Sequence, residues 1–331
     1  MEFTTGGRLE VRISPDDVGK RVSVRRLDEA GVPGARFTDT VGVLTSWNSG
    51  VLTITRRDGE SVHIAESALV AGKVVPSAPA RRRGPAATFE ELARVCARAW
   101  QPVESEPLGE WLLRAAQGFT RRANSALTLG DPGMPVGAAL ERVREWYAAR
   151  GLPAYVQVST GAEGTQERLA AELEQLGWTR EVTAEVRIAA LAPIADLDAD
   201  VSRVRLERAC DAGWLARYQR FQEPGAHVLK VLESGPSVWF ASVPGEGEVP
   251  AAIGRCVVDG RWAGFMAVEV DPAYRRQGIA SAVMTALARR ALYEGASAAW
   301  LQVEADNDGA RALYDGMGFA THHSYSHFRP A

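Results

Sequence analysis

The sequence has few cysteines and none of the spacing that marks cysteine chemistry. Its 331 residues contain three cysteines, Cys96, Cys210 and Cys256. They lie far apart and lack the C-x-x-C spacing of redox and metal motifs, so the sequence predicts reduced thiols in apolar surroundings. A catalytic thiol is the less favoured alternative.

Long apolar runs and an excess of positive charge are also missing. No stretch approaches 18 uninterrupted apolar residues, and the first residues show neither the basic start nor the apolar segment of a secretory signal. Lys and Arg total 38 against 41 Asp and Glu, a formal net charge of -3. Nothing in this balance draws the chain to nucleic acid or anionic lipid. We therefore expect a cytoplasmic protein that binds neither nucleic acid nor membrane, as a monomer or a dimer.

The first 75 residues alternate short apolar segments with turn signals. Strands are predicted over residues 8–13, 21–26, 42–46, 51–56 and 61–64. Their order and length resemble an SH3-like β-barrel over residues 1–75. Residues 76–87 then contain three prolines and an arginine triplet, a composition typical of an extended linker. Contact of the arginines with RNA or an acidic partner is the less favoured interpretation.

After the linker, helical periodicity alternates with strand patterns. Helices are predicted over residues 88–100, 136–150, 166–175, 281–293 and 310–317. An internal repeat aligns GLPAYVQV at 151–158 with GASAAWLQV at 295–303, and each copy continues through a helix into LGW or MGF. The sequence thus predicts an α/β (α+β) fold: two lobes, 88–195 and 196–331, with mixed sheets flanked by helices.

One segment, residues 262–281 (WAGFMAVEVDPAYRRQGIAS), has the residue types needed to bind a phosphate. Met266, Val268 and Val270 are expected on one face of a strand that Pro272 ends. The R-x-x-G-x-A pattern of residues 275–280 follows, with small residues where a ligand must approach the backbone. Successive N–H groups and the positive end of a helix opening at Ser281 favour pyrophosphate binding.

A second segment, residues 300–319 (WLQVEADNDGARALYDGMGF), follows about thirty residues later. Together, the two segments closely resemble motifs A and B of the GNAT acetyltransferases. The resemblance covers residues 260–320 strongly and, through the repeat, extends faintly back to residue 87. A tandem of GNAT-type lobes with the C-terminal one active is thereby implied, and uncharacterised actinobacterial proteins combine a barrel with such lobes.

The resemblance implies acetyl-CoA as co-substrate and a role for each matching residue. In the family the two central strands splay apart and the pantetheine arm lies in the gap. Val268 and Val270 would bond this arm, with the N–H near Val268 polarising the thioester carbonyl. Tyr314 would be the general acid that protonates the leaving thiolate. Asn307 would bond the pantetheine or cap a helix. The pyrophosphate would be held by Arg275, Arg276, Gln277, Gly278, Ile279, Ala280 and Ser281.

The general base and the acceptor are less well defined by the sequence. Some family members carry a glutamate early in the first strand, where this sequence has Gly264 and Phe265, and others carry one in the second strand, where it has Gln302. Water-mediated deprotonation needs no carboxylate, and three glutamates are substitutes by chemistry alone: Glu223, Glu269 and Glu304. Three histidines near the C-terminus have no ligand partners at metal-binding spacing, so we expect no metal site there; they are His322, His323 and His327.

The first lobe keeps the fold cues and lacks the chemistry. Leu173 stands where the repeat predicts a counterpart of Tyr314, and prolines remove N–H donors from the loop ahead of the 136–150 helix. Near the lobe interface, four side chains are candidates for substrate contact: Arg114, Arg121, Arg122 and Asn124.

Three functional interpretations remain. The first is an N-acetyltransferase acting on an amine of a small molecule or protein. The second is a non-catalytic acyl-CoA-binding regulatory or scaffold protein, which the presence of Tyr314 disfavours. The third keeps the enzyme but gives it a longer acyl group, with Phe265 and Met266 lining the acyl pocket.

Overall fold

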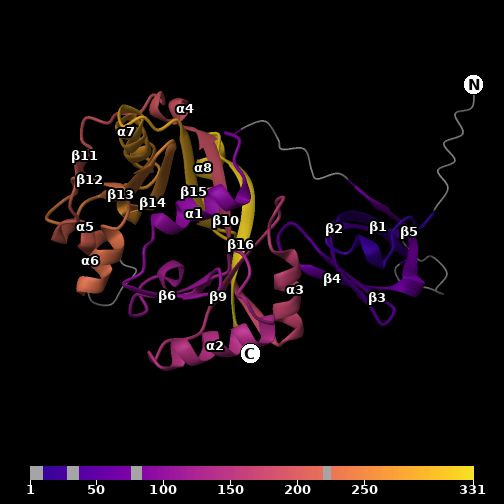
Figure 1. Ribbon diagram of the computed structural model, residues 1–331. Helices are drawn as coiled ribbons and strands as arrows, with labels where there is room; N and C mark the ends of the chain where they lie inside the picture. The colour runs from indigo at the N-terminus through magenta and orange to yellow at the C-terminus, as the bar shows by residue number, and fades with distance from the viewer. Residues whose placement is uncertain (1–9, 28–36, 76–83, 219–224) are drawn as a thin grey trace, which may run out of the picture. The chain divides into compact units, whose positions relative to one another are not determined.

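The computed structural model describes residues 10–27, 37–75, 84–218 and 225–331, which form two compact units. Unit 1 comprises residues 1–80 and 159–179, and unit 2 comprises residues 81–158 and 180–331. Figure 1 shows both units, each built around its own sheet. Helix α3 belongs to unit 1 in this division, whereas the sequence places residues 88–195 in one lobe. The three-domain division stays a prediction.

Unit 1 is a five-stranded antiparallel sheet in the order β4-β3-β2-β1-β5. Its core contains Val22, Leu44 and Ile54, each with 0% exposure. Helix α3 packs against β2 and β3. The elements are β1 (Arg21–Leu27), β2 (Phe37–Asn48), β3 (Val51–Thr55), β4 (Ser61–Ala65), β5 (Leu69–Val74) and α3 (Glu167–Gln175), with short 3-10 helices at Pro15–Asp17 and Glu66–Ala68.

Four predicted strands of the N-terminal segment are confirmed as β1 to β4, and β5 was not predicted. Residues 8 and 9 lie outside the described residues. Within the rest of the predicted 8–13 strand, Val11 forms an isolated bridge to Gly72. The resemblance to an SH3-like barrel stays a prediction, since the strand order alone does not close the sheet.

Unit 2 is built on an 11-stranded mixed sheet in the order β11-β12-β13-β14-β15-β10-β16-β9-β8-β7-β6. The strands are β6 (Glu104–Leu108), β7 (Trp111–Ala115), β8 (Ala126–Leu127), β9 (Val156–Thr160), β10 (Trp178–Ala190), β11 (Arg205–Glu207), β12 (Ser237–Val243), β13 (Ala252–Asp259), β14 (Trp262–Val270), β15 (Ala298–Glu304) and β16 (Ala320–Pro330). The predicted α/β class, with mixed sheets flanked by helices, is confirmed.

The two halves of this sheet exchange their last strands. β10 ends the first half but lies beside β15 of the second, antiparallel, with Ala184 opposite Glu304 and Ala190 opposite Ala298. β16, the last strand of the second half, lies between β10 and β9. In Figure 1 these long strands run through the middle of the unit. The exchange fuses the halves into one sheet, so neither half has an exposed edge strand at their junction.

Helices cover both faces of this sheet. Because strand residues alternate between faces, β15 divides its side chains between two cores. Trp300 joins the core that contains residues of α1 (Phe89–Arg98), α5 (Ala212–Arg217) and α6 (Ala226–Leu232). Leu301 joins the opposite core, under α4 (Leu191–Ala195), α7 (Ile279–Tyr293) and α8 (Asp308–Gly316).

All five predicted helices exist, as α1, α2 (Val136–Ala148), α3, α7 and α8. Two starts were wrong by two residues: α7 begins at Ile279 rather than Ser281, with Gly278 as its N-cap, and α8 begins at Asp308 rather than Ala310. Gly295 follows its end with φ 94°, and the Ala296 N–H bonds to the Ala291 carbonyl, a left-handed helix stop. The short helices α4 to α6 were not predicted, because so few residues give little periodicity.

Candidate functional site

The central feature of unit 2 is a gap between two parallel strands. The β14–β15 ladder runs from Trp262–Ala298 to Phe265–Leu301 and ends there. Both strands continue, β14 to Val270 and β15 to Glu304. Their backbone groups beyond the last pair are therefore not used in this ladder. Gly264 is needed just before the gap, since a Cβ there would lie 2.3 Å from the Trp300 ring.

A β-bulge in β14 sits at the start of this gap. Met266 lies opposite Arg255 and Glu269 opposite Ile253, so Ala267 and Val268 together face the single residue Gly254. Ala267 has φ 52°, a left-handed conformation that a non-glycine residue rarely adopts. The Val268 backbone is outside both recorded ladders.

The bulge also overturns one expectation about side-chain direction. Met266 packs in the core beneath α1 and α6, whereas Val268 and Val270 pack against the core beneath α7. The prediction that all three share one face was wrong, because an extra residue in a bulge reverses the alternation that follows it.

The loop after β14 contains two left-handed residues and leads directly into a helix. Arg276 has φ 61° and Gly278 has φ 76°. Gly278 is the N-cap of α7 and supplies no side-chain cap, so the first N–H groups of this 15-residue helix have no capping side chain. A Cβ added to Gly278 would meet nothing within 4 Å, which shows open space beside these donors.

Several hydrogen bonds hold this loop. The Asp271 carboxylate accepts from the Ala273 N–H at 2.8 Å and from Arg217 Nη2 at 2.6 Å. The backbone hydrogen bond to Ala273, opposed by burial and assisted by Arg217, holds the pKa of Asp271 below its usual range. Arg275 Nε donates to the Val270 carbonyl at 3.2 Å. The residues predicted to hold the pyrophosphate differ in exposure. Four are exposed, namely Arg275, Arg276, Gln277 and Gly278, and three are half-buried, namely Ile279, Ala280 and Ser281.

Helix α8 brings the other two predicted residues to the same side of the sheet. Asn307 is its N-cap, and Oδ1 accepts from the Ala310 N–H at 3.1 Å, so the capping role is observed and leaves Nδ2 outside the cap. Tyr314 is half-buried, packs against the core that Val268 and Val270 also contact, and stacks edge-on against Phe319 at 5.8 Å.

Beneath the bulge lies a buried arginine that the sequence analysis missed. Arg255 is 0% exposed and donates to the carbonyls of Leu232 (2.5 Å) and Ser234 (2.6 Å) and to Met266 Sδ (3.0 Å). Burial lowers its pKa to about 10. The pattern of β13 gives no warning of it, because seven of the eight residues of this strand are buried and Arg255 stands among them as one polar residue.

The proposed bases occupy different surroundings. Glu269 is half-buried in β14, and Glu304 is exposed at the open end of β15. Gln302 is half-buried in β15, and its Oε1 is buried with no hydrogen-bond partner among the described residues. Glu223 lies outside the described residues.

Among the described residues, no hydrogen bond joins a cysteine thiol to a histidine ring. Cys96, Cys210 and Cys256 are free, and burial raises the pKa of Cys210 and of Cys256 to about 12, and that of Cys96 further. A thiol that stays protonated is a poor nucleophile. His322 Nδ1 lies 2.8 Å from His323 Nδ1. Within the described parts of the chain, no three His, Cys, Asp or Glu side chains are grouped to hold a metal ion.

Three of the four candidate contacts in the first half are structural. Arg114 is 3% exposed and bonds to Ser125 and Gln157. Asn124 is 5% exposed and bonds to four backbone groups of its own loop. Arg121 pairs with Glu181 at 3.0 Å. The fourth, Arg122, instead reaches the second half of the unit.

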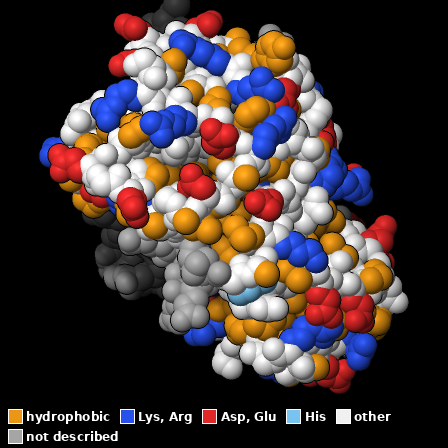
Figure 2. Space-filling view, turned by 90° about the vertical axis from the view of Figure 1, so that its left-hand side faces the viewer, with side chains coloured by type: hydrophobic (Ala, Val, Ile, Leu, Met, Phe, Trp, Pro, Cys, Tyr) orange, Lys and Arg blue, Asp and Glu red, His pale blue; other side chains and the backbone are white. Residues whose placement is uncertain are grey.

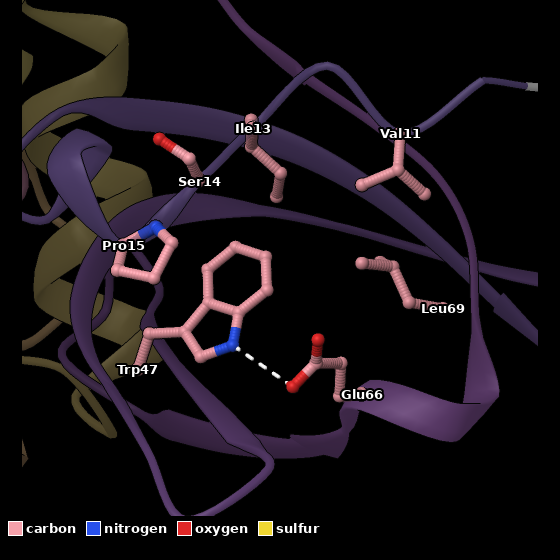
Figure 3. A pocket seen from close by; sticks show the side chains of 7 residues that line it. All are labelled: Val11, Ile13, Ser14, Pro15, Trp47, Glu66 and Leu69. Atoms are coloured by element: carbon pink, nitrogen blue, oxygen red, sulfur yellow. Dashed lines mark hydrogen bonds between the residues drawn. The ribbon is translucent and has the colours of Figure 1, made fainter.

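Unit 1 contains a separate hollow of about 390 Å³ (Figure 3). Trp47 donates a 3.3 Å hydrogen bond to Glu66, the one ionisable side chain of the lining, across a mainly apolar wall. The lining residues are Val11, Ile13, Ser14, Pro15, Trp47, Glu66 and Leu69. These groups offer no acid–base set for group transfer, so we place the chemistry in unit 2.

On the face shown in Figure 2, basic and acidic side chains are interspersed and neither sign forms a broad patch. No helix among the described residues is long and apolar enough to span a membrane.

Solved structures define the class of fold. A GCN5-related N-acetyltransferase from Kribbella flavida superimposes with a TM-score of 0.54 at 20% identity, over 72% of this chain and 95% of that one. A tandem GNAT protein from the clavulanic acid biosynthesis pathway gives 0.51 at 14% identity, over 74% and 89%. Unit 2 thus has the fold of a tandem GNAT protein.

Sequence comparison identifies the family. The protein-family model described as "Probable histone acetyltransferase Rv0428c C-terminal" matches residues 87–328, and the chain belongs to this family. "Probable histone acetyltransferase Rv0428c" of Mycobacterium tuberculosis is 27% identical over 312 residues, 94% of this chain and 95% of that protein. The protein is therefore an acetyltransferase enzyme, and GNAT acetyltransferases generally use acetyl-CoA.

Proposed function

We propose that this protein transfers the acetyl group of acetyl-CoA directly to an amine, at the gap between β14 and β15. The observation that carries the proposal is the uncapped start of α7, at the end of the loop that follows the strand whose ladder ends early. An anion site and a free strand edge at one place suit a ligand with a pyrophosphate and an extended amide arm.

The donor would be held by backbone groups more than by side chains. The left-handed turns at Arg276 and Gly278 and the first N–H groups of α7 would bind the pyrophosphate, assisted by the exposed guanidinium groups of Arg275 and Arg276. Gln277, Ile279, Ala280 and Ser281 complete this segment. Val268 and Val270, beyond the end of the ladder, would bond the amide arm. Acetyl-CoA supplies the thioester.

Polarisation of the carbonyl is assigned to the Val268 N–H. The bulge at Ala267 leaves this position outside the recorded ladders on both sides. A donor fixed by strand geometry needs no reorganisation when charge develops on the carbonyl oxygen. The buried cation of Arg255, bonded to Met266 two residues earlier, adds positive potential on the same part of β14.

Tyr314 is assigned the proton transfer to sulfur. The neutral amine attacks the carbonyl carbon, a C–N bond forms, and the C–S bond breaks. The Tyr314 hydroxyl then gives its proton to the leaving thiolate and regains one from solvent, while the amine proton leaves to water. Asn307, whose Oδ1 caps α8, would use Nδ2 toward the amide arm.

The first lobe is assigned a supporting role. Leu173, the repeat counterpart of Tyr314, is 0% exposed and cannot donate a proton. We keep the division into 1–75, 76–87, 88–195 and 196–331 as part of the proposal, with the barrel-like segment outside the chemistry. A cytoplasmic location, where acetyl-CoA is available as donor, belongs to the same proposal.

The test follows release of free CoA thiol from acetyl-CoA across a panel of amines, with wild type and Tyr314→Phe. We expect Tyr314→Phe to lower kcat about 100-fold while acetyl-CoA binds as in wild type by isothermal titration. Equal kcat in both proteins would remove Tyr314 from the mechanism. Tight binding of acetyl-CoA without turnover of any amine would favour the non-catalytic scaffold.

A further inference from the structure

The loop between β7 and β8 is held in an unusual conformation. Gln117 and Thr120 have φ 51° and 53°, two of the few left-handed non-glycine residues in the described chain. Asn124 locks them there: Oδ1 accepts from the N–H groups of Ala116 and Gly118, and Nδ2 donates to the carbonyls of Phe119 and Thr120, all between 2.7 and 3.0 Å. Backbone strain that is held this firmly often serves a ligand site. The other such residues in unit 2, Ala267 and Arg276, lie in the donor site.

The locked loop delivers Arg122 to the exchanged strand β16. Nε of Arg122 donates to the Tyr325 hydroxyl at 2.8 Å. Nη1 and Nη2 have no partner among the described residues, and no described carboxylate lies within ion-pair distance. The neighbouring Arg121, by contrast, is neutralised by Glu181. Since Tyr325 accepts from Arg122, its own O–H is left to donate. Arg122 and Tyr325 therefore offer several hydrogen-bond donors, and no described carboxylate forms an ion pair with Arg122.

A second, independent observation comes from the same strand. His327, two residues after Tyr325, is 3% exposed, and neither ring nitrogen has a hydrogen-bond partner among the described residues. Its ring lies 5.5 Å from that of Tyr325. Buried polar groups in native proteins are almost always satisfied, if not by protein then by water or ligand. Both ring nitrogens of His327 are thus available to bond a ligand or a water molecule at this junction of the two halves.

The junction lies close to the reacting end of the gap. Ser326 follows Tyr325 in the sequence, and its hydroxyl oxygen lies 2.8 Å from the hydroxyl oxygen of Thr183 in β10. Ala184 pairs in turn with Glu304 of β15. Tyr325 is therefore two strands from Glu304, roughly 10 Å at the usual strand spacing. Tyr325 and Trp300 also belong to the same core, and alternation along β15 directs Glu304 to the Trp300 face.

We infer that the acceptor amine also carries an anionic group, a carboxylate or a phosphate, which Arg122 and Tyr325 bind while the amine lies between Glu304 and the strand gap. The inference rests on the proposed function and adds the chemical class of acceptor to it. It makes the first lobe a source of substrate specificity. The strand exchange is what allows this, since it places Tyr325 of the catalytic half beside Arg122 of the other half.

The test compares matched acceptors in the CoA-release assay with the full-length protein. The probes are β-alanine, 4-aminobutanoate, 5-aminopentanoate and 6-aminohexanoate, each against its primary amide, and phosphoethanolamine against ethanolamine. We expect kcat/KM to favour at least one anionic member over its neutral partner. Arg122→Gln should lower kcat/KM for that member about 10- to 100-fold, the loss of a charge-assisted contact, and leave the neutral partner within about 3-fold. Which pair responds separates carboxylate from phosphate.

Controls separate recognition from folding. Arg121→Gln removes an adjacent positive charge that is already paired and should leave the selectivity unchanged, while Arg122→Lys should retain part of it. Equal losses for both members of a pair in Arg122→Gln, or no anionic preference in wild type, overturn the inference while the proposed function stands. Where no probe is turned over, melting temperatures decide: stabilisation of wild type by an amino carboxylate, lost in Arg122→Gln, supports the inference, and no difference between them overturns it. Failure to bind acetyl-CoA would instead refute the proposed function.

Discussion

Two glycines at opposite ends of α7 allow the donor site to be tested against a matched control. Gly278 before the helix and Gly295 after it have φ 76° and 94°, and a Cβ at either position would meet nothing within 4 Å. Replacing each by Ala therefore costs the same kind of backbone strain, about 1–2 kcal/mol. Both variants should lose a few degrees of melting temperature. They differ only in which end of the helix receives the methyl group.

Binding of acetyl-CoA should distinguish them. A group on Gly278 enters the space beside the uncapped N–H groups, where each hydrogen bond to a phosphate oxygen contributes about 1.5–3 kcal/mol. Losing one such bond in Gly278→Ala weakens binding about 10- to 100-fold, and Gly278→Trp should abolish it. Gly295→Ala should bind as wild type does. Isothermal titration measures all four proteins, and equal affinities for the Gly278 and Gly295 variants would refute the phosphate cradle.

Two further predictions concern buried groups. Arg255→Met leaves the carbonyls of Leu232 and Ser234 without their donor, so the free energy of unfolding, measured by urea titration, should fall by about 2–6 kcal/mol. Arg98→Met is the control: it removes an exposed ion pair with Asp259 and should lower the free energy of unfolding by about 1 kcal/mol or less. Burial, with a smaller effect of His322, lowers the pKa of His323 to about 3 from its ordinary 6.5. The neutral form is favoured in the fold, so its contribution to stability is complete above pH 6.5 and is lost as the pH falls toward 3, by about 1.4 kcal/mol per pH unit. Urea unfolding at pH 7 and pH 5 should show a smaller difference for His323→Gln than for wild type, and an unchanged difference would contradict a neutral buried His323.

The local structure of residues 262–293 could be predicted closely because its signals are local. Gly278 and Pro272 act through their own backbone limits, and the apolar spacing of residues 281–293 marks a helix whatever surrounds it. Even the cap function of Asn307 follows from its place before a helical stretch. The start of α7 was displaced by two residues, because the left-handed conformation of Gly278 decides where the helix begins.

Side-chain direction beyond the bulge could not be predicted in this way. Ala267 has no sequence feature that favours φ 52°, and only its neighbours in the sheet impose it. The extra residue that it introduces sends Met266 to one core and Val268 to the other. Arg255 was missed for a related reason: its partners are the carbonyls of Leu232 and Ser234, twenty residues away or more, and backbone carbonyls leave no trace in composition.

The sequence by itself determined the class of fold, the two motif segments and the repeat, because these depend on periodicity and on residues with restricted or unusual backbone freedom. Only the tertiary structure decided which halves of the sheet share which strands. The repeat predicts equivalent lobes but is the same whether β10 and β16 pair within their own lobe or across to the other. Which strands pair depends on long-range backbone hydrogen bonds, which any side chain permits. The pairing of β16 between β10 and β9 places Tyr325 beside Arg122.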